Sequence, residues 1–128
     1  MLIEFVADGC SDAPLLLIYG YNVEQTRALL HVIKTIRNDL KDRIAIHAIP
    51  GFSGVDGVEL YFHRSDVERG VTRERDTMQF HCFYTGKGWQ QIENLIVPFC
   101  ALNAKLGRFQ WLDETSDISL LFATERHW

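Results

Sequence analysis

Residues 15–19 form a short segment that is apolar at every position, Leu-Leu-Leu-Ile-Tyr, and that ends at Gly20. A strand with one face in water alternates apolar and polar residues, whereas a strand covered on both faces is apolar throughout. A run of five is also too short for a typical buried helix. We therefore expect residues 15–19 to form a central strand of a sheet.

The residues after Gly20 carry the signals of a helix start. Asn22 is a favourable N-cap, and Gln25 three residues later can complete a capping box. Apolar residues then recur at three- and four-residue intervals, as in a helix with one face against a sheet. The pattern predicts a helix that ends at Lys41-Asp42, with this stripe in the core: Val23, Leu29, Leu30, Ile33, Ile36 and Leu40.

Two strands are predicted after this helix, separated by a loop. Residues 43–49 are rich in residues that favour strands, and residues 50–57 contain a proline and three glycines, so we expect no strand there. Val58, Leu60 and Phe62 alternate with polar residues. This alternation predicts a half-buried antiparallel strand.

The second half of the chain repeats this order of elements. A strand is predicted at 79–84, then a helical stripe from Trp89 to Leu106 that is interrupted or restarted at Pro98, then strands at 108–112 and 118–123. We infer a pseudo-repeat of a strand-helix-strand-strand unit, with halves at about 15–63 and 80–124. Residue identity between the halves is slight, so independent use of a common pattern explains it equally well.

Two further strands complete the expected fold. Residues 2–7 are predicted to form an N-terminal strand, followed by a turn at 8–14, and residues 71–75 form a charged strand suited to a sheet edge. The sequence thus predicts one α+β domain over residues 1–128, with a mainly antiparallel sheet and two helices packed on one of its faces.

Composition excludes several classes of protein. The apolar fraction of 47% and charged fraction of 23% are typical of a globular protein. A net charge of -4, with acids and bases interspersed, predicts no binding to nucleic acid or to a membrane surface. We recognise no signal peptide or membrane span, and we therefore expect a cytoplasmic protein. The cysteines are odd in number and lack CxxC spacing, so we expect reduced thiols at Cys10, Cys82 and Cys100.

The alternation along the predicted strands places polar and aromatic residues on the sheet face opposite the helices. In the strands that contain Leu60 and Phe80, the residues that alternate with the apolar ones should point away from the core. The same holds for Arg108, provided that Phe109 and Trp111 point into the core. The candidate binding residues on this open face are Glu59, Tyr61, His63, Gln79, His81, Phe83 and Arg108.

These residues support three interpretations. His47, His63 and His81 with Glu59 would be a plausible ligand set for zinc or iron, and a neutral imidazole can move protons near pH 7. Alternatively, the histidines belong to a solvated sheet face, because a shift of one residue in register would reverse every side chain. In the third interpretation the apolar side chains of Tyr61, Phe83 and Leu121 form a ligand cleft or a dimer surface without metal.

Two turns contain residues that could form a site. Cys10-Ser11 could hold a nucleophile, but the nearby Asp8 and Asp12 would raise the thiol pKa, so a structural turn is favoured. Residues 85–88 precede a helix and could hold an anion, but they lack the spacing of a phosphate loop, so a plain strand-to-helix turn is favoured.

Two other groups are also favoured as structural. The acids of residues 113–117 could bind calcium, but their spacing is not that of an EF-hand, so a solvated acidic loop is expected. The second group consists of aromatic residues that could line a cofactor pocket, but their helical and strand spacing favours the core: Trp89, Phe99, Trp111 and Phe122.

The sequence favours a binding or protein-interaction module that uses the open sheet face without a cofactor. Its partner would be a second copy of the chain, another protein or a small ligand. The alternative is a small metal-dependent or general acid–base enzyme that uses the histidines. A third function, suggested by the net charge and the acidic loop, is an acidic inhibitor or immunity-type protein.

Overall fold

The structure is a computed structural model that describes residues 1–10, 13–101 and 107–126, without the side chain of Cys10. The predictions for Ser11, Asp12 and Leu106 lie outside these residues. The described helices are α1 (Val23–Arg37) and α2 (Gly86–Ile96). The described strands are β1 (Leu2–Cys10), β2 (Ala13–Tyr19), β3 (Arg43–Ala45), β4 (Ser53–Gly54), β5 (Glu59–Arg64), β6 (Gly70–Arg73), β7 (Gln79–Tyr84), β8 (Phe109–Asp113) and β9 (Ser119–Ala123).

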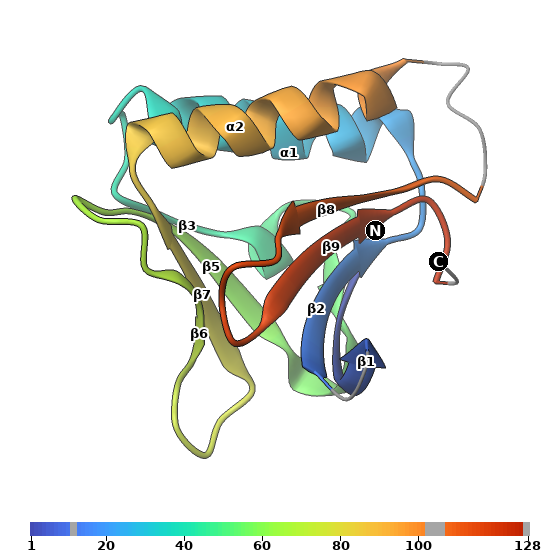
Figure 1. Ribbon diagram of the computed structural model, residues 1–128. Coiled ribbons are helices and arrows are strands. Elements are labelled where there is room, and N and C mark those ends of the chain that lie inside the picture. The colour runs from blue at the N-terminus through green and yellow to red at the C-terminus, as the bar shows by residue number, and fades with distance from the viewer. Residues whose placement is uncertain (11–12, 102–106, 127–128) are drawn as a thin grey trace.

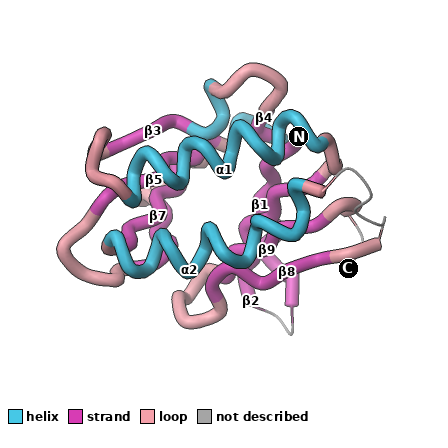
Figure 2. Tube along the Cα trace, turned by 90° about the horizontal axis from the view of Figure 1, so that it is seen from above, coloured by secondary structure: helices cyan, strands magenta, loops and turns pink. Residues whose placement is uncertain are grey.

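The strands form two sheets, and the helix pair lies over both of them. Sheet A has the order β4-β1-β2-β9-β8, and sheet B has the order β3-β5-β7-β6. Figure 1 shows α1 and α2 above the two sheets. Seen from above, the helices run side by side, with the strands of sheet B on one side and those of sheet A on the other (Figure 2).

The predicted α+β class is therefore confirmed, but the prediction of a single, mainly antiparallel sheet is wrong. Both sheets are mixed, because β2 pairs with β9 in parallel and β5 pairs with β7 in parallel. Each of these pairs joins a strand of the first half to a strand of the second half. The structure gives no support to the predicted pseudo-repeat, and local patterns cannot reveal such pairing because the partners lie far apart in the sequence.

The main hydrophobic core lies between the two sheets and beneath the helices. It combines residues from sheet A, such as Ile18 and Phe122, with residues from sheet B, such as Phe62 and Phe80, and all four are fully buried. Phe5 of sheet A and Phe80 of sheet B are in direct contact, with ring centroids 4.9 Å apart. A smaller cluster containing Leu15, with Leu17, Leu121 and Ala123, lies on the other face of sheet A. Leu121 is therefore buried in sheet A, and its expected exposure on one face with Tyr61 and Phe83 was wrong.

The predicted central strand is confirmed. β2 occupies the middle of sheet A, and its residues from Leu15 to Ile18 are fully buried because core clusters lie on both faces. β1 extends to Cys10, beyond the predicted end at Ala7. The predicted turn at 8–14 is correspondingly shorter.

Helix α1 begins where the sequence predicts and ends earlier. The Asn22 side chain accepts a hydrogen bond from the backbone N–H of Gln25 at 3.0 Å. The helix ends at Arg37 rather than at Lys41, and Leu40 is 73% exposed, so its assignment to the core stripe was wrong. Asp39 has a positive φ of 59°, a conformation that ends a helix and that Asp tolerates better than most residues.

Several loop and strand assignments also differ. The segment 50–57 contains the two-residue strand β4, which pairs with β1, although its glycines and proline argued against any strand. Pro98 lies in the first turn of a new 3₁₀ helix, Val97–Cys100, which is one of the two predicted alternatives. Phe109 is 46% exposed and Trp111 packs on the smaller cluster, so the condition under which Arg108 was placed on the open face, that both rings point into the core, is not met. None of the described helices has the length and apolar character needed to cross a membrane.

Candidate functional site

The candidate site is the open face of sheet B, which points away from the main core. Along β5 and β7 the buried residues alternate with half-buried ones, as the sequence predicts. The parallel register places Tyr61 beside His81 and His63 beside Phe83. We call these four residues the aromatic cluster.

A short contact between two imidazole rings lies at the centre of the aromatic cluster. His63 Nε2 and His81 Nδ1 are 2.7 Å apart, a hydrogen-bond distance, so one of these nitrogens carries the shared proton. The Tyr61 ring stacks on His81 with centroids 5.1 Å apart, and the Phe83 ring stacks on His63 at 4.4 Å. The cluster is therefore a continuous layer of rings across the two central strands.

Two arginines lie over the outer rings of this layer. The Arg43 guanidinium carbon is 4.1 Å from the centroid of the Tyr61 ring, and that of Arg69 is 4.3 Å from the centroid of Phe83. Both arginines are solvent-exposed, and their positions over ring faces are those of cation–π interactions. Arg43 comes from edge strand β3, and Arg69 directly precedes edge strand β6.

The histidine pair is held in its neutral form. Burial lowers the pKa of His63 to about 4, and the positive charges of His81, Arg43 and Arg69 act in the same direction. Burial also lowers the pKa of His81, although the nearby Glu74 carboxylate opposes this effect. Near pH 7 both rings therefore present neutral nitrogen atoms at the surface.

Acidic side chains lie at the opposite end of the same face. Glu59 Oε1 accepts a hydrogen bond from the Tyr61 hydroxyl at 2.8 Å and lies 3.7 Å from Nε2 of His47. Glu74 Oε2 lies 4.0 Å from Nε2 of His81. Because Glu59 begins β5 and Arg43 pairs with His63 near its end, acids and bases occupy opposite ends of the strands.

The structure does not assemble the predicted metal site. His47 lies in a 3₁₀ helix, Ile46–Ala48, and its Nδ1 accepts a hydrogen bond from the backbone N–H of Leu60 at 3.0 Å. That nitrogen is therefore unavailable to a metal. Among the residues that the structure describes, no three or more His, Cys, Asp or Glu side chains are arranged to hold a metal ion, so the donor set does not fit zinc or iron.

The remaining predicted site residues divide between the two sheets. Gln79 pairs with Glu59 at the acidic end of the open face. Arg108 instead precedes β8 in sheet A, where its guanidinium carbon lies 5.3 Å from the centroid of Phe99. Arg108 was misplaced because the prediction assumed one sheet and the inward orientation of its neighbours.

Sequence reasoning missed Arg43, Arg69 and Glu74 as members of this face. Arg43 and His47 lie an even number of residues apart in the predicted strand 43–49, so the alternation that placed His47 on the open face also predicted Arg43 there. Arg69 and Glu74 flank β6 at its two ends, where no periodicity constrains the direction of a side chain. Only the tertiary structure places them beside the aromatic cluster.

The other sequence candidates have structural roles. The turn before α2 is occupied by a side chain of the chain itself, since Glu68 accepts hydrogen bonds from the backbone N–H and the hydroxyl of Thr85. Asp113 is buried and accepts hydrogen bonds from Thr115 and Ser116, so this acid is not part of a solvated loop. Trp89, Phe99 and Phe122 are core residues, as favoured.

Comparisons with known proteins assign no family to the chain. No protein-family model matches it, and searches of curated proteins and of solved structures find no similar protein.

Proposed function

We propose that this protein is an interaction module that forms a homodimer through the open face of sheet B. The observation that carries the proposal is the separation of charge along this face. Arg43 and Arg69 lie at one end, Glu59 and Glu74 lie at the other, and the aromatic cluster lies between them. A surface with this arrangement is complementary to a second copy of itself.

The symmetry of a dimer supplies the geometric argument. A two-fold axis that lies in the interface and runs across the strands turns one copy end for end over the other. The basic end of each copy then faces the acidic end of its partner. Arg69 and Glu74 both lie at the β6 side of the sheet, so each would approach the other residue in the second copy. Such an interface contains each favourable charge contact twice.

The residue types at the centre support burial in an interface. Tyr, Phe and Arg are enriched in the cores of protein interfaces, because they combine large contact areas with few rotatable bonds or with several hydrogen-bond donors. The neutral histidines lower the cost of removing this face from water, because a neutral ring loses less hydration than a charged one.

The first experiment compares the subunit count of variants by native mass spectrometry and sedimentation velocity. We expect the unmodified chain to be a dimer and Phe83→Glu to be a monomer, because the new carboxylate would be buried between the copies. Phe109→Glu is the matched control, since Phe109 is an exposed phenylalanine on sheet A. A monomeric unmodified chain, or equal dissociation of both variants, would contradict the proposal.

A charge exchange tests the orientation of the two copies. Arg69→Glu and Glu74→Arg should each weaken the homodimer, because each places like charges in both symmetric contacts. An equimolar mixture of the two variants should restore a dimer that contains one copy of each. Failure of the mixture to associate, while both variants remain folded by circular dichroism, would exclude the proposed two-fold arrangement.

The alternative functions have weaker support. A general base works best when its pKa lies near the working pH, and a pKa of about 4 leaves His63 a weak base near pH 7. The metal-dependent version lacks a suitable ligand set among the described residues. The acidic-inhibitor function relied on the 113–117 loop, whose first carboxylate is buried and engaged within the chain.

A further inference from the structure

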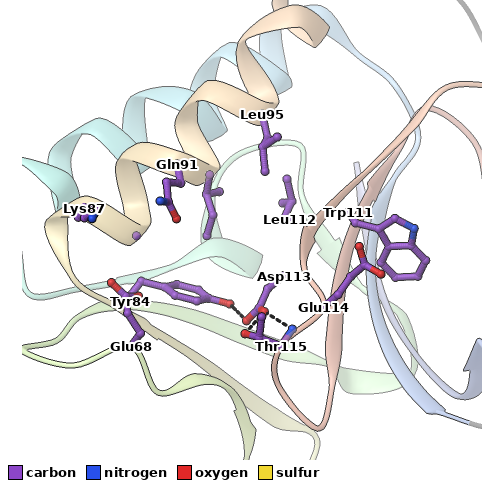
Figure 3. A pocket seen from close by; sticks show the side chains of 12 residues that line it. Glu68, Tyr84, Lys87, Gln91, Leu95, Trp111, Leu112, Asp113, Glu114 and Thr115 are labelled. Atoms are coloured by element: carbon purple, nitrogen blue, oxygen red, sulfur yellow. Dashed lines mark hydrogen bonds between the residues drawn. The ribbon is translucent and has the colours of Figure 1, made fainter.

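A cavity of about 550 Å³ lies between α2 and the segment that leads out of β8, away from the open face of sheet B. Figure 3 shows it beneath α2, with Tyr84 and Asp113 opposite the helix. Its volume is within the range of about 300–1,000 Å³ that is typical of small-molecule sites. The cavity is large enough for a small organic molecule.

One wall of the cavity is apolar. It consists of Ile92 and Leu95 on α2 and of Leu112 on β8. Leu95 and Leu112 approach each other from the two elements in Figure 3. This wall would be in contact with the hydrocarbon part of a ligand, and its burial would favour binding.

The floor of the cavity contains a buried negative charge. Asp113 is 8% exposed and accepts hydrogen bonds from the hydroxyl of Tyr84 and, at 2.7 Å, from the hydroxyls of Thr115 and Ser116. These hydrogen bonds lower the pKa of Asp113 and keep it ionised, although burial opposes them. All the donors are neutral, and none of the described cationic groups lies within ion-pair distance of this carboxylate.

Two further carboxylates line the cavity and are exposed to solvent. Glu68 lies next to Gly88, where a Cβ atom would stand 2.3 Å from its Oε2, so the glycine leaves room for this carboxylate. Glu114 follows Asp113 in the chain, and Lys87 is the one cationic residue among the lining residues. Three carboxylates against one ammonium give the cavity a net negative charge.

From this combination we propose that the cavity binds a small cationic molecule with an apolar body, such as a primary amine attached to an aromatic or aliphatic group. The ammonium contacts Glu68, whose Oε2 accepts no hydrogen bond from the described residues, and Glu114, at the other end of the cavity in Figure 3, adds its negative charge. Asp113, whose lone pairs are already used by its hydrogen bonds, contributes through its charge. The hydrocarbon body lies against Ile92, Leu95 and Leu112.

The test uses three probes of similar shape: 2-phenylethylamine, 2-phenylethanol and 3-phenylpropanoate. Isothermal titration near pH 7 should give binding of the amine at least about tenfold tighter than binding of the alcohol. The carboxylate should bind more weakly than either. Tighter binding of 3-phenylpropanoate would assign the charged contact to Lys87 and would overturn the proposal, as would equal affinity for all three probes.

Two variants locate the binding site. Glu68→Gln combined with Glu114→Gln should lower affinity for the amine about tenfold and leave affinity for the alcohol unchanged. Leu95→Trp should fill the cavity and abolish the binding of both probes. Because these substitutions avoid Asp113, they preserve the hydrogen bond that it accepts from Tyr84. Unchanged amine binding in both variants, with folding verified by circular dichroism, would place the site elsewhere and contradict the proposal.

Discussion

At the scale of single residues, His63 lies on the open face of sheet B but is partly buried by neighbouring side chains. Its ring lies between Phe83 and His81, and two arginines lie over the neighbouring rings. The resulting environment disfavours a positive charge on the imidazole, which lowers its pKa to about 4. The same histidine in an unfolded chain titrates near its ordinary value of 6.5.

This difference predicts a pH dependence of stability. Between pH 6.5 and about 4 the unfolded chain binds a proton at this residue that the folded chain does not, so the free energy of unfolding falls as the pH falls. Urea titrations across this range should show a smaller fall in His63→Gln than in the unmodified protein. His31→Gln, which changes an exposed residue of α1, is the control and should leave the slope unchanged. Equal slopes in all three proteins would contradict the assigned environment of His63.

At the scale of elements, α1 shows which parts of a periodic pattern contribute to the core. Leu29, Ile33 and Ile36 are fully buried, whereas Leu40 fits the same periodicity but lies beyond the end of the helix. The pattern identified the correct face of the helix but not its last residue. Helix ends depend on local conformations, such as the positive φ of Asp39, that periodicity does not encode.

The corresponding prediction compares two leucines that the sequence pattern does not distinguish. Leu29→Ala should lower the free energy of unfolding by about 2–5 kcal/mol, because it removes buried methyl groups and leaves a cavity. Leu40→Ala should change it by less than about 0.5 kcal/mol, since the side chain is 73% exposed. Chemical denaturation of both variants measures the difference. Similar losses at the two positions would mean that α1 continues past Arg37.

At the scale of the whole molecule, the fold depends on pairing between distant segments. β2 and β9 lie at opposite ends of the chain and pair in parallel, and the core between the sheets receives residues from both. Neither sheet can bury its inner face without the other and the helices. We infer that the two halves of the chain fold as one cooperative unit.

Cooperative folding can be tested by following the unfolding of the two sheets separately. Trp89 lies in the core beside sheet B, and Trp111 lies in sheet A. Both variants also carry Trp128→Phe, so that each keeps one of the three tryptophans. At a fixed protein concentration, urea unfolding should have the same midpoint by the fluorescence of Trp89 in Trp111→Phe, by that of Trp111 in Trp89→Phe, and by circular dichroism within each variant. Separate midpoints for fluorescence and circular dichroism within one variant would indicate that the sheets unfold independently.

Local patterns in the sequence predict the type of most elements, the core faces of α1, β5 and β7, and the central position of β2, because each depends on a local period or on a short apolar run. They also place Tyr61, His63, His81 and Phe83 on one face, since alternation fixes side-chain direction within a strand. Only the three-dimensional structure shows that there are two mixed sheets, that Arg108 precedes a strand of sheet A and is not on the open face of sheet B, and that the Tyr84 hydroxyl donates a hydrogen bond to Asp113. Those features depend on which distant strands pair and on how their loops approach, and no local pattern in the sequence records either of these.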